Sequence, residues 1–170
     1  PQDTSQQDAM NATMQRLLEF NTVNAASVDV FDGELRHFLT FWRSFEVNVA
    51  ERTNDYGVRL NKLLNSCSPE IKKTLDACVG MEAKVGYERA VSLLWRNYGQ
   101  YEAIVCAMMD HLKNIPPIGI NDWNTLRGFA DDLENALLNL QYLTKRSQQE
   151  GRPIDYVSQA GHIENLAKLI

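Results

Sequence analysis

The chain has 170 residues, of which 44% are hydrophobic and 23% are charged, a composition typical of a folded soluble protein with one domain or two small ones. Its net charge of −5 and its scattered Lys and Arg residues disfavour a general nucleic-acid-binding surface, which needs clustered basic residues. No apolar run is as long as a membrane span, and the polar residues 1–7 lack the regions of a signal peptide. We therefore expect a cytoplasmic protein that binds no membrane.

Residues 1–30 are predicted to form one helix and an extended lead-in. Met10, Met14, Leu17 and Leu18 recur at helical spacing, which predicts an amphipathic helix over residues 8–20 and then a connector. Residues 28–31 alternate briefly between apolar and polar side chains, too short a pattern for a sheet. We expect this stretch to be extended and to deliver an aromatic side chain to the core.

The densest aromatic helix of the sequence follows, and the other elements are expected to pack onto it. Asp32-Gly33 is a turn signal, after which apolar residues recur every three or four positions to a predicted end near Thr53. These apolar residues are Leu35, Phe38, Leu39, Trp42, Phe45 and Val49. Because Phe41 lies at one edge of this stripe and Val47 on the other side, we predict that both face a partner protein.

Three shorter helices complete a predicted first lobe, residues 31–99. Their apolar stripes run over residues 56–67, 69–79 and 87–98, and Ser68-Pro69 supplies an N-cap followed by proline at the first helical position. Gly80 and Gly99 are placed to close two of these helices in the left-handed conformation. The aromatic residues predicted to anchor the core are Phe31, Phe38, Trp42, Phe45, Trp95 and Tyr98, with Trp123 in the next lobe.

Residues 100–170 form the predicted second lobe. A helix from Tyr101 to Leu112 is broken at Pro116-Pro117, because consecutive prolines cannot continue a helix. A longer helix runs from Trp123 to Leu140, and a polar turn follows at residues 147–152. The apolar pattern is still running at the last residue, so the final helices either end a small lobe or belong to a longer helix that is cut. The sequence thus predicts an all-α fold of two small helical lobes.

The side chains that carry catalysis or bind metals do not converge in the sequence. Glu34 and His37 have the spacing of a di-iron ligand pair, but no second pair occurs, so a solvent-facing histidine is the favoured interpretation. Motifs for nucleophilic catalysis and phosphate binding are missing. Three cysteines, Cys67, Cys78 and Cys106, are an odd number in apolar settings, which predicts buried, reduced thiols. We expect no enzyme, no cofactor, no metal and no small-molecule substrate.

From residue 30 to residue 142 the order of residues resembles the Gag capsid region of LTR retrotransposons, most of all the BEL/Pao group. The resemblance rests on Phe31-Asp32-Gly33, on Phe38, Trp42 and Phe45, on Leu63-Leu64, on Ser68-Pro69-Glu70-Ile71, and on Tyr87 to Leu94 closing at Tyr98-Gly99. The signature of the retroviral second lobe is not reproduced around residues 118–133.

This resemblance implies a two-lobed, all-helical capsid protein without an active site, whose copies assemble into rings or shells around the RNA of the element. RNA binding in such chains often lies in a separate basic tail or zinc knuckle, so RNA contact is expected only through regions outside this segment. Two function classes follow: a self-assembling shell protein, or a domesticated Gag-derived adaptor that binds a partner peptide or helix in an apolar groove. Sequence alone does not separate them.

Overall fold

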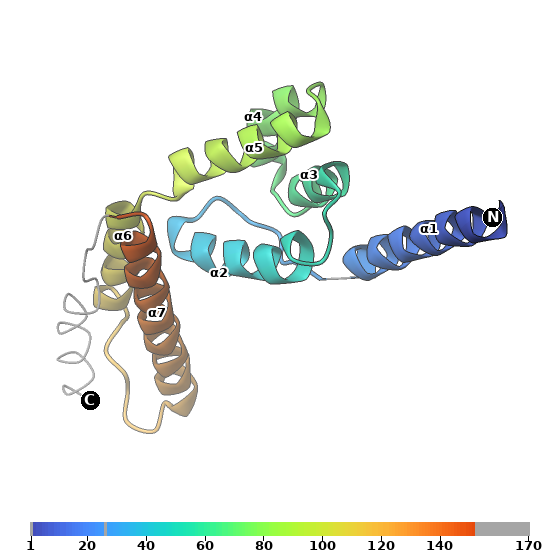
Figure 1. Cartoon of the computed structure of the whole chain (residues 1–170). Helices are drawn as coiled ribbons and strands as arrows, with labels where there is room; N and C mark the ends of the chain where they lie inside the picture. Colours follow the sequence, from blue (N-terminus) through green and yellow to red (C-terminus); the bar gives the residue numbers. More distant parts are fainter. Residues whose placement is uncertain (1, 26, 152–170) are drawn as a thin grey trace. The chain divides into compact units, whose positions relative to one another are not determined.

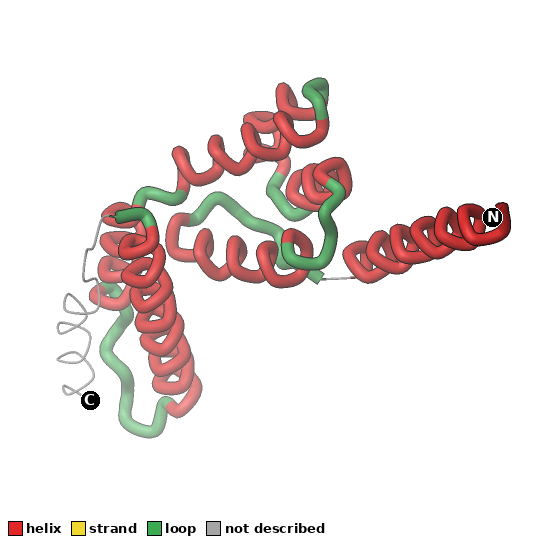
Figure 2. The backbone as a smooth tube through the Cα atoms, viewed as in Figure 1, coloured by secondary structure: helices red, strands yellow, loops and turns green. Residues whose placement is uncertain are grey.

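A computed structural model describes residues 2–25 and 27–151, and the fold is all-α, as the helical periodicity predicted (Figure 1). Among these residues, β pairing is limited to one isolated bridge, and helices joined by loops make up the rest (Figure 2). The chain divides into two compact units between Gly99 and Gln100. Within the described residues, no helix is both long enough and apolar enough to cross a membrane.

The first unit contains most of the helices. They are α1 (Gln2–Ala25), α2 (Leu35–Phe45), the π-helix η1 (Glu46–Ala50), α3 (Tyr56–Asn65), α4 (Pro69–Val79) and α5 (Ala83–Tyr98). Side chains cap two of the helix starts, since the Asp55 carboxylate accepts from the backbone N–H of Gly57 at 2.8 Å and the Glu82 carboxylate accepts from that of Lys84 at 3.2 Å. Pro69 occupies the first turn of α4, where its missing N–H costs no intrahelical hydrogen bond.

Aromatic rings from the lead-in, α2 and α5 build the core of this unit. The Phe31 ring stacks on Phe41 with centroids 5.1 Å apart and meets Tyr98 edge-on at 5.0 Å. Phe38 and Trp42 each meet the Trp95 ring edge-on, at 5.0 and 5.5 Å. Edge-on and offset contacts suit the ring quadrupole and add to the free energy gained by burying apolar area. The four anchors on the lead-in and α2, Phe31, Phe38, Trp42 and Phe45, are buried, and the two on α5, Trp95 and Tyr98, are half-buried.

The lead-in reaches the core through two backbone hydrogen bonds. The Phe31 N–H donates to the Ser66 carbonyl at 2.9 Å, and the Ser68 N–H donates to the Phe31 carbonyl at 2.9 Å. These bonds form the bridge between Phe31 and Cys67 and satisfy backbone groups that burial would otherwise leave without partners. Gly33 follows with a φ of 95°, a left-handed conformation that glycine adopts without steric cost, and the chain turns there into α2.

The second unit contains α6 (Tyr101–Lys113) and α7 (Trp123–Gln149), which pack side by side as a helical hairpin. Apolar side chains fill the seam between the two helices: Ile104, Val105, Met108 and Leu112 from α6, and Ala136, Leu140 and Leu143 from α7. The Asp122 carboxylate caps α7 by accepting from the Thr125 N–H at 3.1 Å. The helices expected after Pro153 lie outside the described residues.

Several predicted helix ends are wrong. α1 continues through most of the expected connector, because polar residues without glycine or proline do not stop a helix. α7 runs past the predicted end at Leu140 into the first residues of the predicted polar turn, and it ends at Gln149, shortly before Gly151. The predicted single helix up to Thr53 instead changes to the π-helix η1 after Phe45. Gly80 and Gly99 have φ values of −80° and −94°, so neither closes its helix in the left-handed conformation.

Candidate functional site

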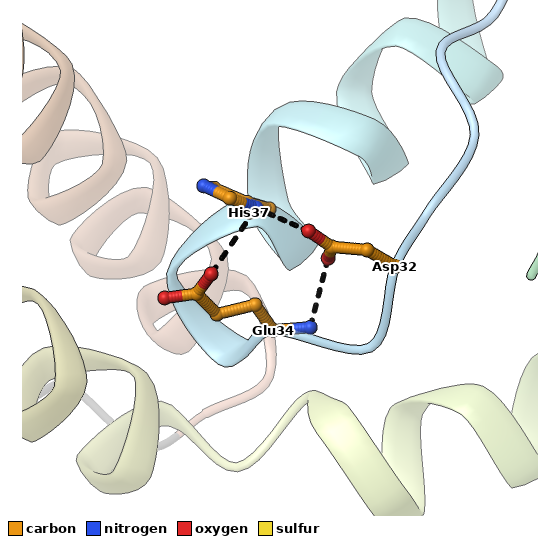
Figure 3. Close-up of side chains that lie close together, drawn as sticks. All are labelled: Asp32, Glu34 and His37. Atoms are coloured by element: carbon orange, nitrogen blue, oxygen red, sulfur yellow. Dashed lines mark hydrogen bonds and ion pairs between the residues drawn. The ribbon is translucent and has the colours of Figure 1, made fainter.

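The start of α2 brings together three chemically active side chains, Asp32, Glu34 and His37 (Figure 3). His37 Nδ1 lies 2.9 Å from an Asp32 carboxylate oxygen and 3.7 Å from a Glu34 carboxylate oxygen. The other Asp32 oxygen accepts a hydrogen bond from the Glu34 backbone N–H at 2.9 Å. The turn at Gly33 makes this possible, because it folds the aspartate back over the first turn of the helix.

All three side chains are exposed, and each already has a partner within the chain. Glu34 is paired with the Arg36 guanidinium, and that hydrogen bond holds the pKa of the glutamate below its ordinary value. The Glu34 backbone N–H, and then His37, hold the pKa of Asp32 below its ordinary value. Carboxylates near the first turn also interact favourably with the helix dipole, so this cluster stabilises the start of α2. The Glu-x-x-His spacing does not include Asp32, so the sequence pattern alone did not predict that this carboxylate joins the cluster.

A second histidine joins the two helices of the second unit. His111 stands alone in the sequence, but its Nε2 lies 2.8 Å from an Asp132 oxygen on α7. At the other end of the hairpin the Tyr101 hydroxyl donates to Glu150 at 2.9 Å, and Arg146 donates to the same carboxylate at 3.0 Å. Burial and the Glu150 carboxylate together raise the pKa of Tyr101 to about 12. These polar contacts join α6 to α7 at both ends of the hairpin.

For two of the predicted site residues, the observed burial is the reverse of the prediction. Phe41 was predicted to face a partner, yet only 4% of its surface is exposed, because its ring stacks on Phe31. Trp123 was predicted to anchor the core, yet it is 72% exposed, because it is the first residue of α7 and lies at the helix end. Val47, on η1, is exposed, and its contact with a partner remains a prediction. Cys106 is also exposed, against the expectation of a buried thiol, whereas Cys67 and Cys78 are buried.

Large apolar side chains are exposed in several groups that suit protein contacts. One group lies along α1, a second at the turn between α4 and α5, a third at the start of α7 and a fourth near the middle of α7. They are Met10, Met14, Leu17 and Leu18; Val79, Met81 and Val85; Ile120 and Trp123; and Leu137 and Leu138. Grouped exposed apolar residues mark binding surfaces more often than scattered ones do. These groups are candidate surfaces for contacts with other macromolecules.

A groove of about 610 Å³ adds a concave feature to the first unit. It is lined by Thr13, Arg16 and Leu17 of α1 and by residues 53–55 and Val58 at the start of α3. The lining combines two apolar side chains, Leu17 and Val58, with polar and charged ones.

A comparison with known protein families shows to which family the chain belongs. Residues 31–154 match the family described as "Protein of unknown function (DUF1759)", a match that covers most of the chain and all of α2 to α7. The chain belongs to the DUF1759 family. DUF1759 domains occur in Gag-Pol and polyprotein regions of retrotransposons and are Gag-like rather than catalytic. Searches of curated proteins and of solved structures found no match.

Membership of DUF1759 agrees with the coarse part of the resemblance seen in the sequence. A retrotransposon Gag-like region is what both the family and the motif order indicate. The match begins at Phe31, the residue at which the lead-in enters the aromatic core, and α1 lies outside it. The Asp32, Glu34 and His37 cluster and the hairpin of α6 and α7 both belong to the DUF1759 region.

Proposed function

We propose that this DUF1759 chain is the structural capsid (Gag) protein of a BEL/Pao-like LTR retrotransposon, and that it self-assembles into the shell of virus-like particles. The family match carries the proposal, since it places the chain in a retrotransposon Gag-like family over most of its length. The all-helical fold and its division into two compact units agree with the two-lobed protein that the sequence resemblance implies. The exposed apolar groups also support the proposal, because they give the chain surfaces for contacts between copies.

Each contact between copies is expected to be weak. A closed shell needs interfaces that form, break and correct, so the buried area per contact is small and many contacts together supply the stability. The net charge of −5 makes neighbouring copies repel one another at low ionic strength. Raising the salt to about 1 M shortens the screening length to roughly 3 Å, which removes most of this repulsion and leaves apolar contacts in place.

Assembly should therefore increase with both protein concentration and salt. Light scattering across a grid of the two, followed by electron microscopy of the scattering samples, measures it. Rings or closed particles that appear at high concentration and high salt are the expected result. A chain that stays monomeric across the whole grid would contradict the capsid function.

A domesticated Gag-derived adaptor is the second candidate, and the groove beside the start of α3 favours it. Its apolar lining residues, Leu17 and Val58, and the polar residues that line it with them suit an extended or helical peptide. Titration with a peptide library separates the candidates, because an adaptor binds a defined peptide as a monomer and a shell protein assembles without one. Genomic context is a second test: a protease and reverse transcriptase encoded downstream favour the element, and an isolated gene favours the adaptor.

In this proposal the chain binds other copies of itself, and the particles that these copies form are cytoplasmic. The packaged RNA of the element is contacted through regions outside this segment, because the basic residues here are scattered and the net charge is negative. No cofactor, small-molecule substrate or membrane takes part.

A further inference from the structure

The groove of about 610 Å³ in the first unit has two walls, one on α1 and one at the start of α3. Arg16 and Leu17 lie three and four residues after Thr13, so all three side chains project from the same side of α1. Residues 53–55 and Val58 form the other wall. A groove of this volume is in the range of sites that hold small ligands or a few side chains of a peptide.

Two polar side chains of the groove are free to bind a ligand. Within residues 2–25 and 27–151, the Arg16 guanidinium makes no ion pair or hydrogen bond, and neither does the Asn54 carboxamide. Both side chains are exposed. A guanidinium donates two parallel hydrogen bonds to a carboxylate, and a carboxamide donates through its NH₂ group. The groove therefore offers a positive charge and hydrogen-bond donors to an anionic group.

Asp55 also lines the groove, and its carboxylate is already committed to the fold. One carboxylate oxygen accepts from the backbone N–H of Gly57 at 2.8 Å and of Val58 at 3.1 Å, next to the positive end of the α3 dipole. The charge that remains on Asp55 repels a second negative charge on a ligand. Phosphate groups and nucleic acids are bound by clusters of basic residues, so this groove suits a single carboxylate better.

The apolar part of the groove lies beside the positive charge. Leu17 directly follows Arg16 in the sequence and is 54% exposed, and Val58 on α3 is half-buried. A ligand that covers these two side chains gains free energy in proportion to the apolar area removed from water. The groove thus combines one contact for an apolar side chain with one for an anion.

We propose that the groove binds a peptide in which a carboxylate lies beside a large apolar side chain, such as glutamate next to leucine. Arg16 and Asn54 bind the carboxylate, and Leu17 and Val58 pack against the apolar side chain. Charge complementarity selects this class of peptide, because a neutral peptide leaves the Arg16 guanidinium without a partner. The proposal rests on the adaptor candidate for its occupant, since it names the class of peptide that such an adaptor binds.

Two peptides of the same shape test the carboxylate on the full chain. The probes are acetyl-Leu-Glu-Leu-amide and acetyl-Leu-Gln-Leu-amide, added at low salt, where net charge keeps copies of the chain apart. NMR of the Asn54 side-chain amide and the Val58 backbone N–H reports binding in the groove itself. The glutamate peptide should bind at least about fivefold more tightly, because a charge-assisted hydrogen bond is stronger than a neutral one. Equal dissociation constants, or no binding of the glutamate peptide at millimolar concentration, would overturn the proposal.

Matched arginine substitutions assign the preference to the groove. Arg16→Gln should raise the dissociation constant of the glutamate peptide at least about fivefold and leave that of the glutamine peptide unchanged. Arg127→Gln removes the same charge from an exposed position on α7 and should change both constants less than about twofold. A similar loss in both variants would mean that net charge sets the preference, which would exclude Arg16 as the ligand. Circular dichroism verifies that both variants keep the wild-type helix content.

A matched pair of leucine substitutions tests the apolar contact. Leu17→Ala should weaken the binding of both peptides at least about threefold, because it removes apolar area that either peptide covers. Leu18→Ala shortens a neighbouring leucine that is 59% exposed and does not line the groove, so it should leave both affinities unchanged. Equal effects of the two substitutions would contradict an apolar contact in the groove.

Failure of this proposal is distinguishable from failure of the proposed functions. A chain that binds both peptides equally well in the groove keeps the adaptor candidate and excludes a carboxylate as the preferred ligand. Particle assembly across the grid of salt and protein concentration needs no peptide. A chain that forms no particles but prefers the glutamate peptide therefore keeps the groove ligand and excludes the capsid function.

Discussion

Phe41 and Trp42 are sequence neighbours on α2, and both rings are buried to the same extent, each with 4% of its surface exposed. A helix turns by about 100° per residue, so two neighbours share the core only where partners surround a wide arc of the helix. The lead-in and α5 are these partners, because Phe31 stacks on Phe41 and Trp95 of α5 contacts Trp42. The two rings therefore contribute comparably to stability.

Truncating Phe41 should be far more costly than truncating Trp123. Phe41→Ala removes a buried ring and leaves a cavity, so the free energy of unfolding should fall by about 3 to 5 kcal/mol, as for Trp42→Ala. Trp123 is 72% exposed, so Trp123→Ala should change that free energy by less than about 0.5 kcal/mol. Urea unfolding followed by far-UV circular dichroism measures all three variants. A small loss for Phe41→Ala would mean that the ring faces solvent.

The three cysteines should differ sharply in reactivity. The thiolate is the reactive form, and burial raises the pKa of Cys67 to about 12 and also raises that of Cys78. Cys106 is exposed on α6. At pH 8 an aromatic disulfide reagent should titrate one thiol of the native chain rapidly and all three in denaturant. Cys106→Ser should abolish the rapid phase, and a second rapid thiol in the native protein would place Cys67 or Cys78 at the surface.

At the scale of elements, Arg59 of α3 binds backbone carbonyls at the end of the π-helix η1 and in the loop after it. Its guanidinium donates to the Ala50 carbonyl at 2.6 Å and to the Thr53 carbonyl at 2.7 Å, so carbonyls at the end of η1 have partners. The same group lies 5.2 Å from the Tyr56 ring centroid and 5.8 Å from that of Tyr87 on α5. One side chain thus links η1, α3 and α5.

Glycine has opposite roles in α5 and α7, so the same substitution should have opposite effects. A Cβ atom on Gly86 would lie 2.4 Å from the Cys78 carbonyl oxygen, because α4 and α5 approach closely there, so Gly86→Ala should lower the free energy of unfolding by about 1 to 3 kcal/mol. A Cβ on Gly128 meets no atom within 4 Å, so Gly128→Ala should raise it by about 0.5 to 1 kcal/mol through helix propensity. Thermal or urea unfolding measures the change in the free energy of unfolding for both variants. A stabilising Gly86→Ala would contradict the close packing of α4 on α5.

At the scale of the whole molecule, net charge opposes the association of copies. The formal charge of −5 falls towards zero near the isoelectric point of about 5.2. Self-repulsion weakens as the net charge falls, whereas burial of apolar groups does not depend on these charges.

Assembly at low salt should therefore begin at a lower protein concentration near pH 5.2 than at pH 7. Light scattering at both pH values measures the threshold concentration, with circular dichroism to verify that the helices persist. In about 1 M salt the two thresholds should converge, because screening removes the repulsion at either pH. A pH difference that persists unchanged in high salt would point to a specific titrating group in place of net charge.

Helical periodicity alone determined the fold class, the order of the helices and most of the core. Periodic apolar residues predict a buried helix face wherever they occur, because a helix repeats every 3.6 residues whatever packs against it. The starts of α4 and α6 and the closing positions of α5 and α6 were predicted within a few residues for that reason. The resemblance to Gag proteins came from the order of these same motifs, and the family match supports its coarse form.

Only the tertiary structure decided what surrounds each position. Phe41 is buried because Phe31, ten residues earlier, stacks on it. Trp123 is exposed because, within the described residues, no other element covers its side chain at the first turn of α7. Asp32 joins His37 because Gly33 adopts a left-handed conformation, and His111 meets Asp132 because α6 and α7 form a hairpin. A periodic pattern records which side of a helix is apolar. Whether another segment covers that side depends on contacts between residues far apart in the chain, and no local pattern contains them.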